Sequence, residues 1–221
     1  EGSAPLWGWR RESAGQAPFR VLVLPGNAGN ALDRIYFVRL VEALGGEAVL
    51  LEYPGYGGRP GSPTEAGLVS AALAAVDRLA GEGPLFLLGE SLGSGVAVQA
   101  AAARPGGVRG LLLVTPYASM VEVAARTYPW LPARLLLQDR WDSVGAMAGY
   151  PGPVALLLAG RDEVVGVEEG RALARAVPGR KQVWVQPEAG HNTLSLDPGR
   201  GGWSAAMAFL RDEEGPGGVR R

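Results

Sequence analysis

One stretch of the sequence constrains the possible fold of this chain most. It is an apolar run of strand length that stops at a glycine and continues, through a lone serine, into a helix. Residues 85–88 form the run, the pattern Gly89-x-Ser91-x-Gly93 follows, and small apolar residues of helical character continue to about residue 104. So tight a turn requires flanking positions without bulk, which explains the two glycines. The pattern predicts a nucleophile elbow, which lifts a serine hydroxyl above a sheet edge. The alternative is a glycine-rich turn that only packs a helix against a strand.

Strand-like and helical segments alternate along the whole chain. We expect strands at residues 6–10 (an edge strand), 19–24, 47–53, 85–88, 108–114, 154–158 and 182–186. We expect helices at residues 31–44, 65–80 (capped by Thr64), 92–104, 167–177 and 202–210, and a frayed polar end at 211–221. Continuous apolar strands that alternate with helices predict an α/β fold with a mostly parallel central sheet and helices on both faces.

Residues 117–150 break this alternation. Aromatic residues and prolines gather there, among them Tyr128, Trp130 and Trp141. We expect a short, partly helical, lid-like insertion over the active edge of the sheet, within one domain that spans residues 1–221. For the three aromatic side chains, packing within the lid is favoured over contact with substrate.

Composition excludes several classes of function. The 221 residues are 47% hydrophobic and 19% charged, which is typical of a globular domain with a sizeable core. The net charge of −1 indicates neither nucleic-acid binding nor an acidic membrane surface, and no apolar run approaches the ~20 residues of a membrane span. With no cysteine and one histidine, thiol catalysis, disulfides and multi-histidine metal sites are excluded. We therefore expect no metal and no cofactor.

A serine hydroxyl becomes a nucleophile only when a base of near-neutral pKa takes its proton. His191 is the only histidine, and it lies in the loop after the last predicted strand. Such a base needs a carboxylate that orients the imidazole, and Asp162 lies just after the expected strand 154–158. The order Ser91, Asp162, His191 is the one expected for this fold. Three other carboxylates remain alternatives for the acid: Glu163, Asp139 and Asp142.

An ester's tetrahedral intermediate needs two hydrogen-bond donors for its oxyanion. The backbone amide of Leu92, directly after the serine, is one candidate, and Asn27 in the glycine-rich loop 26–29 is the other. A rival interpretation makes this loop a phosphate-binding turn, but it lacks the three-glycine spacing of a dinucleotide loop. Cofactor binding is therefore not favoured. Asn192, beside the histidine, is interpreted as a turn residue rather than one that orients the loop.

Several short motifs together resemble a known superfamily across most of the chain. They are residues 25–30, 53–57, 89–93, 115–117, 128–132, 139–143, 160–163 and 190–192. With these motifs the chain resembles the α/β-hydrolase superfamily, and more narrowly the small-lid branch of bud-emergence-type serine hydrolases and eukaryotic protein depalmitoylases. The resemblance implies Ser91 as nucleophile, Asp162 as acid and His191 as base, with Asn27 and Leu92 as oxyanion donors.

One residue departs from the pattern of that branch. Pro25 stands where the branch usually has His, in the sequence His-Gly-Asn-Ala-Gly-Asn. Proline cannot make the loop hydrogen bonds of that histidine. We therefore expect either that the oxyanion loop is held in another way or that the enzyme is weaker.

The sequence predicts a serine hydrolase that cleaves a carboxylic ester or thioester of a small molecule through an acyl-enzyme. The alternatives are a peptidase-type hydrolase on the same triad and a noncatalytic relative that binds a ligand or partner. Because the chain begins at Glu1 without Met, we expect an upstream segment, either a first strand or a signal or anchor peptide. Membrane association is expected only through such a segment, and the compartment and oligomeric state are left open.

Overall fold

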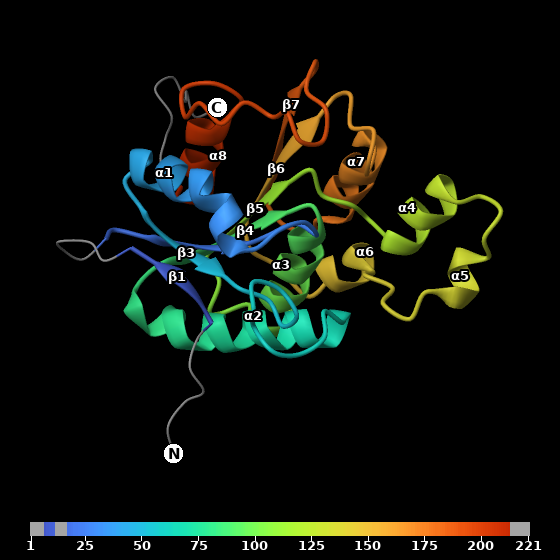
Figure 1. Ribbon diagram of the computed structural model, residues 1–221. Coiled ribbons are helices and arrows are strands. Elements are labelled where there is room, and N and C mark those ends of the chain that lie inside the picture. Colours follow the sequence, from blue (N-terminus) through green and yellow to red (C-terminus); the bar gives the residue numbers. More distant parts are fainter. Residues whose placement is uncertain (1–6, 12–16, 213–221) are drawn as a thin grey trace.

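A computed structural model describes residues 7–11 and 17–212 of the chain (Figure 1). Within these residues seven strands form one sheet in the order β1-β3-β2-β4-β5-β6-β7. The strands are β1 (Gly8–Arg10), β2 (Arg20–Leu24), β3 (Glu47–Leu51), β4 (Leu85–Glu90), β5 (Gly110–Val114), β6 (Val154–Ala159) and β7 (Lys181–Gln186). Leu6 of the expected edge strand and residues 213–221 of the expected frayed end lie outside the described residues.

The sheet is parallel except for its short first strand, as expected for the α/β class. Strand β1 runs antiparallel to β3 at one edge, and the other neighbouring pairs are parallel. The inner strands β2 to β6 are buried almost throughout, because helices cover both of their faces. Strand β2 lies between β3 and β4, so the loop that follows it is flanked by the ends of both neighbours.

Helices form a layer on each face of the sheet (Figure 1). Helices α1 (Ile35–Ala43) and α8 (Trp203–Leu210) pack on one face, and α2 (Glu65–Leu79) and α3 (Leu92–Ala103) pack on the other with α7 (Val167–Ala176). Short 3-10 turns, η1 (Ala31–Arg34) and η2 (Ala80–Glu82), precede α1 and follow α2. The cap predicted for α2 is present, since Gly67 N–H donates to Thr64 Oγ1 at 3.2 Å. None of the helices in the described part of the chain combines the length and apolar character needed to cross a membrane.

Small residues allow α3 to approach the sheet closely. A Cβ added to Gly89 would meet the backbone of Ser94 at 2.7 Å, and one on Gly93 would overlap the carbonyl oxygen of Leu24. On the far side of α3, a Cβ on Gly95 would overlap the hydroxyl of Tyr117. The start of α3 is thus fixed directly above the ends of β2 and β4, where the elbow lies.

The connection from β5 to β6 holds the segment predicted as an insertion. It contains α4 (Met120–Thr127), α5 (Ala133–Leu136) and α6 (Ser143–Met147), and an antiparallel bridge between Ser119 and Asp142 closes its base. Helices α4 and α5 extend away from the sheet (Figure 1).

The three aromatic residues expected to pack within this segment differ in burial. Trp141 is buried, but Tyr128 is 48% exposed and Trp130 is 74% exposed. The rings of Tyr128 and Trp130 contact each other edge to face, with their centroids 5.8 Å apart. Tyr128 and Trp130 therefore pack against each other within the segment but are not buried.

Candidate active site

Ser91 occupies the sharp turn between β4 and α3. Its backbone has φ 48° and ψ −115°, a conformation that residues other than glycine rarely adopt. The turn is held by a hydrogen bond from Ser91 N–H to the carbonyl of Val114 at 2.9 Å, at the end of the neighbouring strand. Backbone strain of this kind is concentrated at functional sites, where the surrounding structure maintains it.

The structure brings Ser91, His191 and Asp162 together from three separate loops. His191 Nε2 lies 3.0 Å from Ser91 Oγ, and His191 Nδ1 lies 2.9 Å and 3.0 Å from the two carboxylate oxygens of Asp162. The side chains of His191 and Asp162 are 8% and 3% exposed. A hydroxyl, an imidazole and a carboxylate therefore form one hydrogen-bonded row at the carboxyl edge of the parallel strands.

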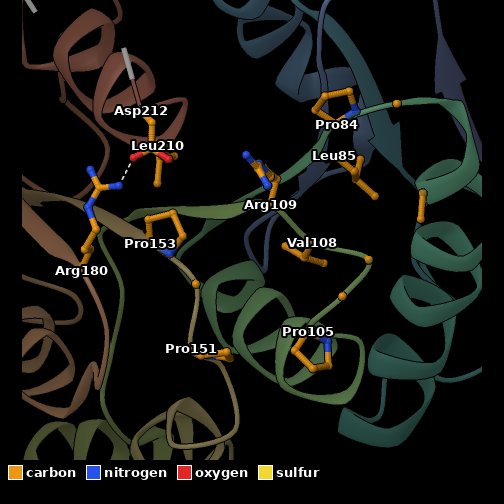
Figure 2. Close-up of a pocket in the computed structure, with 15 residues that line it drawn as sticks. Pro84, Leu85, Pro105, Val108, Arg109, Pro151, Pro153, Arg180, Leu210 and Asp212 are labelled. Atoms are coloured by element: carbon orange, nitrogen blue, oxygen red, sulfur yellow. Dashed lines mark hydrogen bonds and ion pairs between the residues drawn. The ribbon is translucent and has the colours of Figure 1, made fainter. Parts of the chain in front are cut away.

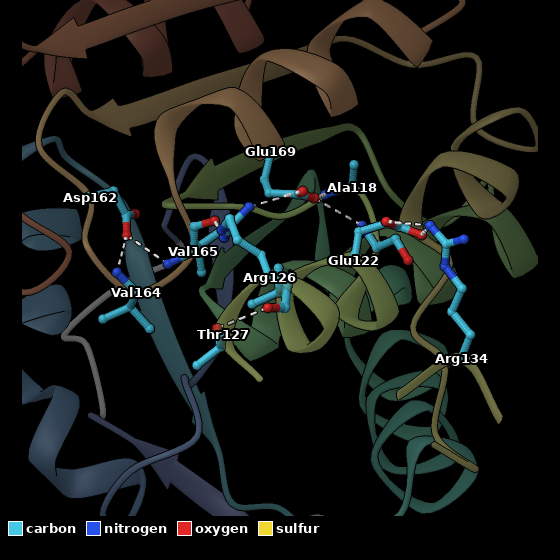
Figure 3. A network of polar contacts seen from close by, with 11 residues as sticks. Ala118, Glu122, Arg126, Thr127, Arg134, Asp162, Val164, Val165 and Glu169 are labelled. Atoms are coloured by element: carbon cyan, nitrogen blue, oxygen red, sulfur yellow. Dashed lines mark hydrogen bonds and ion pairs between the residues drawn. The ribbon is translucent and has the colours of Figure 1, made fainter. Parts of the chain in front are cut away.

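The carboxylate of Asp162 is also bound by its own loop. Val164 and Val165 donate their backbone N–H groups to Asp162 Oδ1 at 3.0 Å and 2.8 Å (Figure 3). Burial by itself raises the pKa of Asp162, but the hydrogen bond and charge of His191 and the backbone N–H groups outweigh it. The pKa of Asp162 therefore lies below its ordinary value, and the group is a carboxylate at neutral pH.

A polar network joins the Asp162 loop to α4 (Figure 3). Arg126 on α4 donates to the carbonyl of Val165 and pairs with Glu169 at 3.5 Å. Glu169 in turn accepts from the N–H groups of Ala118 and Ser119 at 3.1 Å and 3.3 Å. The segment that follows β5 is thereby attached to the loop that holds Asp162.

The other carboxylates considered for the acid have different partners. Glu163 accepts from the backbone N–H of His191 at 3.2 Å, so it holds the loop rather than the ring. Asp142 caps α6 through Gly145 N–H at 2.9 Å. No contact of the imidazole with Asp139 occurs among the described residues. Asn192 is exposed in the turn, as interpreted from the sequence.

The two residues expected to donate to an oxyanion belong to segments that adjoin Ser91. Leu92 is the first residue of α3, so its N–H has no intrahelical acceptor. A Cβ built on Gly26 would lie 3.5 Å from Ser91 Cβ, which places the loop after β2 against the elbow. Asn27 follows in that loop, and its Oδ1 accepts a hydrogen bond from the hydroxyl of Tyr56 at 2.7 Å.

A cavity of about 640 Å³ lies at the amino-terminal ends of the parallel strands, opposite the end where Ser91 lies. Figure 2 shows the residues that line it. Its walls include Pro84, Arg109, Pro153 and Arg180, which precede or begin strands β4 to β7. Strand β4 alone spans about 20 Å, at about 3.3 Å a residue. The cavity is therefore separated from Ser91 by the length of the sheet and does not serve the row of polar side chains.

Two glutamates near the elbow were not identified from the sequence. Glu90 ends β4 and accepts from Gly26 N–H at 3.0 Å, and Glu52 follows β3 and accepts from Ala31 N–H at 3.1 Å. Their signal in the sequence is a carboxylate at the end of an otherwise apolar run. Such a residue has to be hydrogen-bonded when it is buried, but the sequence does not say to what.

This chain belongs to the α/β-hydrolase family: residues 20–139 match the family described as alpha/beta hydrolase fold. An uncharacterized protein of Mycobacterium tuberculosis, Rv2307c, is 37% identical over 211 residues, which cover 93% of this chain and 74% of that protein. Lysophosphatidylserine lipase ABHD12 of Gallus gallus is 32% identical over 130 residues, 55% of this chain and 34% of that protein.

Solved structures share the fold at low sequence identity. The Pyrococcus furiosus esterase Pf2001 superposes with a TM-score of 0.74 at 15% identity, over 94% of this chain and 86% of that chain. The family match, together with a relative named as a lipase, supports hydrolase activity.

Proposed function

We propose that this chain is a serine hydrolase that cleaves carboxylic ester or thioester bonds. The observation that carries the proposal is the row in which Ser91 Oγ lies 3.0 Å from His191 Nε2 and Asp162 lies 2.9 Å from His191 Nδ1. The serine stands at a strained strand-to-helix turn, the imidazole is nearly buried, and the carboxylate is ionised at neutral pH. These are the three roles of a nucleophile, a base and a residue that orients the base.

The chemistry follows from the atoms in the row. His191 Nε2 takes the proton of Ser91 as Oγ attacks the substrate carbonyl, and Asp162 holds the Nδ1–H tautomer and stabilises the imidazolium. The backbone N–H groups of Asn27 and Leu92 donate to the oxyanion. His191 then returns the proton to the leaving alcohol or thiol, which departs and leaves an acyl-enzyme. Water, deprotonated by His191, attacks the acyl-enzyme and releases the carboxylic acid and free Ser91.

A small-molecule ester or acyl compound is the proposed class of substrate. Relatives named as an esterase and as a lysophosphatidylserine lipase support this class over a peptide. The segment 117–150 is proposed as the lid, because α4 contacts the Asp162 loop through Arg126.

Labelling with a fluorophosphonate probe tests the proposal. We expect the wild-type protein to be labelled at Ser91, and Ser91→Ala and His191→Ala to lose labelling. Ser204→Ala is the control, because the hydroxyl of Ser204 is exposed and donates to the carbonyl of Pro198, outside the site. A series of p-nitrophenyl esters of rising acyl length then measures the acyl preference. Labelling that survives in Ser91→Ala, or a wild-type protein that is not labelled at all, contradicts the assignment.

A further inference from the structure

The loop between β2 and η1 is held at both ends by carboxylates from the two neighbouring strands. At its start, Gly26 N–H donates to Glu90 Oε2 at 3.0 Å. At its end, Ala31 N–H donates to both oxygens of Glu52 at 3.1 Å and 3.2 Å. The strand order places β2 between β3 and β4, so the two carboxylates reach the loop from opposite sides. Asn27 lies between these two attachments.

Glu90 has two further donors, both fixed. Arg34 Nε lies 2.8 Å from Glu90 Oε2, and the hydroxyl of Tyr36 donates to Oε1 at 2.9 Å. Burial and the charge of Glu90 raise the pKa of Tyr36, so the phenol keeps its proton as a donor. Burial is the largest single influence on Arg34 and lowers its pKa, but the hydrogen bond and the charge of Glu90, with smaller contributions from Tyr36 and Asp33, together raise the pKa of the guanidinium. With the side chain of Glu90 only 18% exposed, one carboxylate accepts three directed hydrogen bonds.

The position of Glu90 in the chain connects its bond to Gly26 with the position of Ser91. Glu90 is covalently adjacent to Ser91 and its side chain is restrained by Arg34 and Tyr36, so the group that Glu90 binds is held close to the nucleophile. Pro25 has no N–H, which makes Gly26 the first donor of the loop, and Glu90 binds that donor. The next backbone N–H along the chain is that of Asn27.

We infer that Glu90 is the positioning residue of the oxyanion hole, which sets the Asn27 N–H relative to Ser91 through its bond to Gly26. This inference rests on the proposed function and concerns a residue that does not touch the substrate. An oxyanion donor contributes about 10²- to 10³-fold in kcat, and a misplacement of about 1 Å removes much of such a contribution. Glu90 therefore acts on the transition state, in which the oxyanion exists, and hardly on substrate binding.

Glu90→Gln tests the inference. The amide keeps the size of the side chain, but its NH₂ group cannot accept hydrogen bonds from the donors of Gly26, Arg34 and Tyr36 as a carboxylate oxygen does. We expect kcat for p-nitrophenyl esters, normalised to titrated active sites, to fall by about 30- to 100-fold, with KM within about threefold. The Ki of a trifluoromethyl ketone, which forms a tetrahedral adduct with the serine, should rise by the same factor as kcat/KM falls.

Glu42→Gln is the matched control, because Glu42 pairs with Arg11 at 3.2 Å on the exposed end of α1. We expect its kcat, KM and Ki to equal those of the wild type. Glu90→Gln with wild-type kcat and Ki overturns the inference. A lower melting temperature or fewer titrated sites, with unchanged kcat and Ki per site, also overturns it, because Glu90 would then serve the fold alone. Failure of the proposed function is recognised separately, as a wild-type protein that the fluorophosphonate does not label.

Discussion

At the scale of single residues, the charge of the Asp162 carboxylate depends on two opposing influences of its surroundings. Burial favours its protonated form, whereas the imidazole of His191 and two backbone N–H groups favour the ionised form. The second influence is larger, so the pKa of Asp162 is lower in the folded chain than in the unfolded chain. This difference links the free energy of unfolding to pH.

We predict that this contribution of Asp162 is lost in acid. Because its pKa is depressed by folding, the carboxylate stabilises the fold above the unfolded value of about 3.9, and the contribution disappears as pH falls through the lower folded value. Urea unfolding of the wild type and Asp162→Asn between pH 7 and pH 3 measures it. The stability difference between the two proteins should be largest near neutral pH and shrink below about pH 4. A difference that stays constant over this range contradicts the prediction.

At the scale of secondary-structure elements, the contact between α3 and the end of β2 determines the position of Ser91. The helix reaches the sheet because Gly89 and Gly93 present no side chain to the facing backbone. The same approach brings Gly26 against Ser91. The elbow is therefore a property of three segments, and a bulkier residue in any of them shifts the serine.

Gly93→Ala tests this dependence. A methyl group there would overlap the carbonyl oxygen of Leu24, and backbone cannot move aside as a flexible side chain does. We expect a loss of about 1–3 kcal/mol in the free energy of unfolding and a lower kcat, because α3 has to move with Ser91. Gly106→Ala is the control: no atom lies within 4 Å of its added Cβ, so we expect a change within about 0.5 kcal/mol. Equal effects in urea unfolding would argue against close packing as the cause.

At the scale of the whole molecule, a buried ion cluster joins the edge of the sheet to its centre. Glu47 at the start of β3 lies 2.5 Å from Arg10 Nε of β1 and 2.8 Å from Arg20 Nε of β2. The contact with Arg20 is an ion pair that lacks hydrogen-bond geometry. Glu82 adds a second carboxylate, 2.8 Å from Arg10. The cluster links β1, β2 and β3 at the amino-terminal ends of the parallel strands, whereas Ser91 lies at their carboxyl-terminal ends.

Glu47→Gln should destabilise the whole fold. The side chains of Glu47 and Arg20 are 5% and 7% exposed, so the change removes the nearer of the two carboxylates that face this buried guanidinium and leaves only Glu82, at 3.4 Å. Breaking a buried pair in this way costs about 3–5 kcal/mol. Glu168→Gln removes the exposed partner of Arg171 on α7 and should change the free energy of unfolding far less. Chemical denaturation of both variants decides between them, and comparable losses would contradict a buried cluster.

Local sequence was sufficient for the order and approximate bounds of the strands and of the helices outside residues 117–150. Apolar runs predicted the inner strands within a few residues, and Thr64 marked the start of α2, because strand burial and helix capping depend on neighbours along the chain. Trp130 shows where such reasoning fails. Trp130 lies in the turn between α4 and α5, where an aromatic side chain is buried only if another element covers it, and that depends on residues far away in the chain.

The sequence by itself determined the α/β class, the elbow at Ser91 and the shortage of alternatives to His191, since turn chemistry and residue type are local properties. Only the tertiary structure decided which of four carboxylates faces the imidazole and which side chains hold the loop around Asn27. Hydrogen bonds act over about 3 Å, and the groups that form these bonds are 21 to 64 residues apart in the chain. Their partners were therefore set by the crossing of strands and helices, which no local pattern specifies.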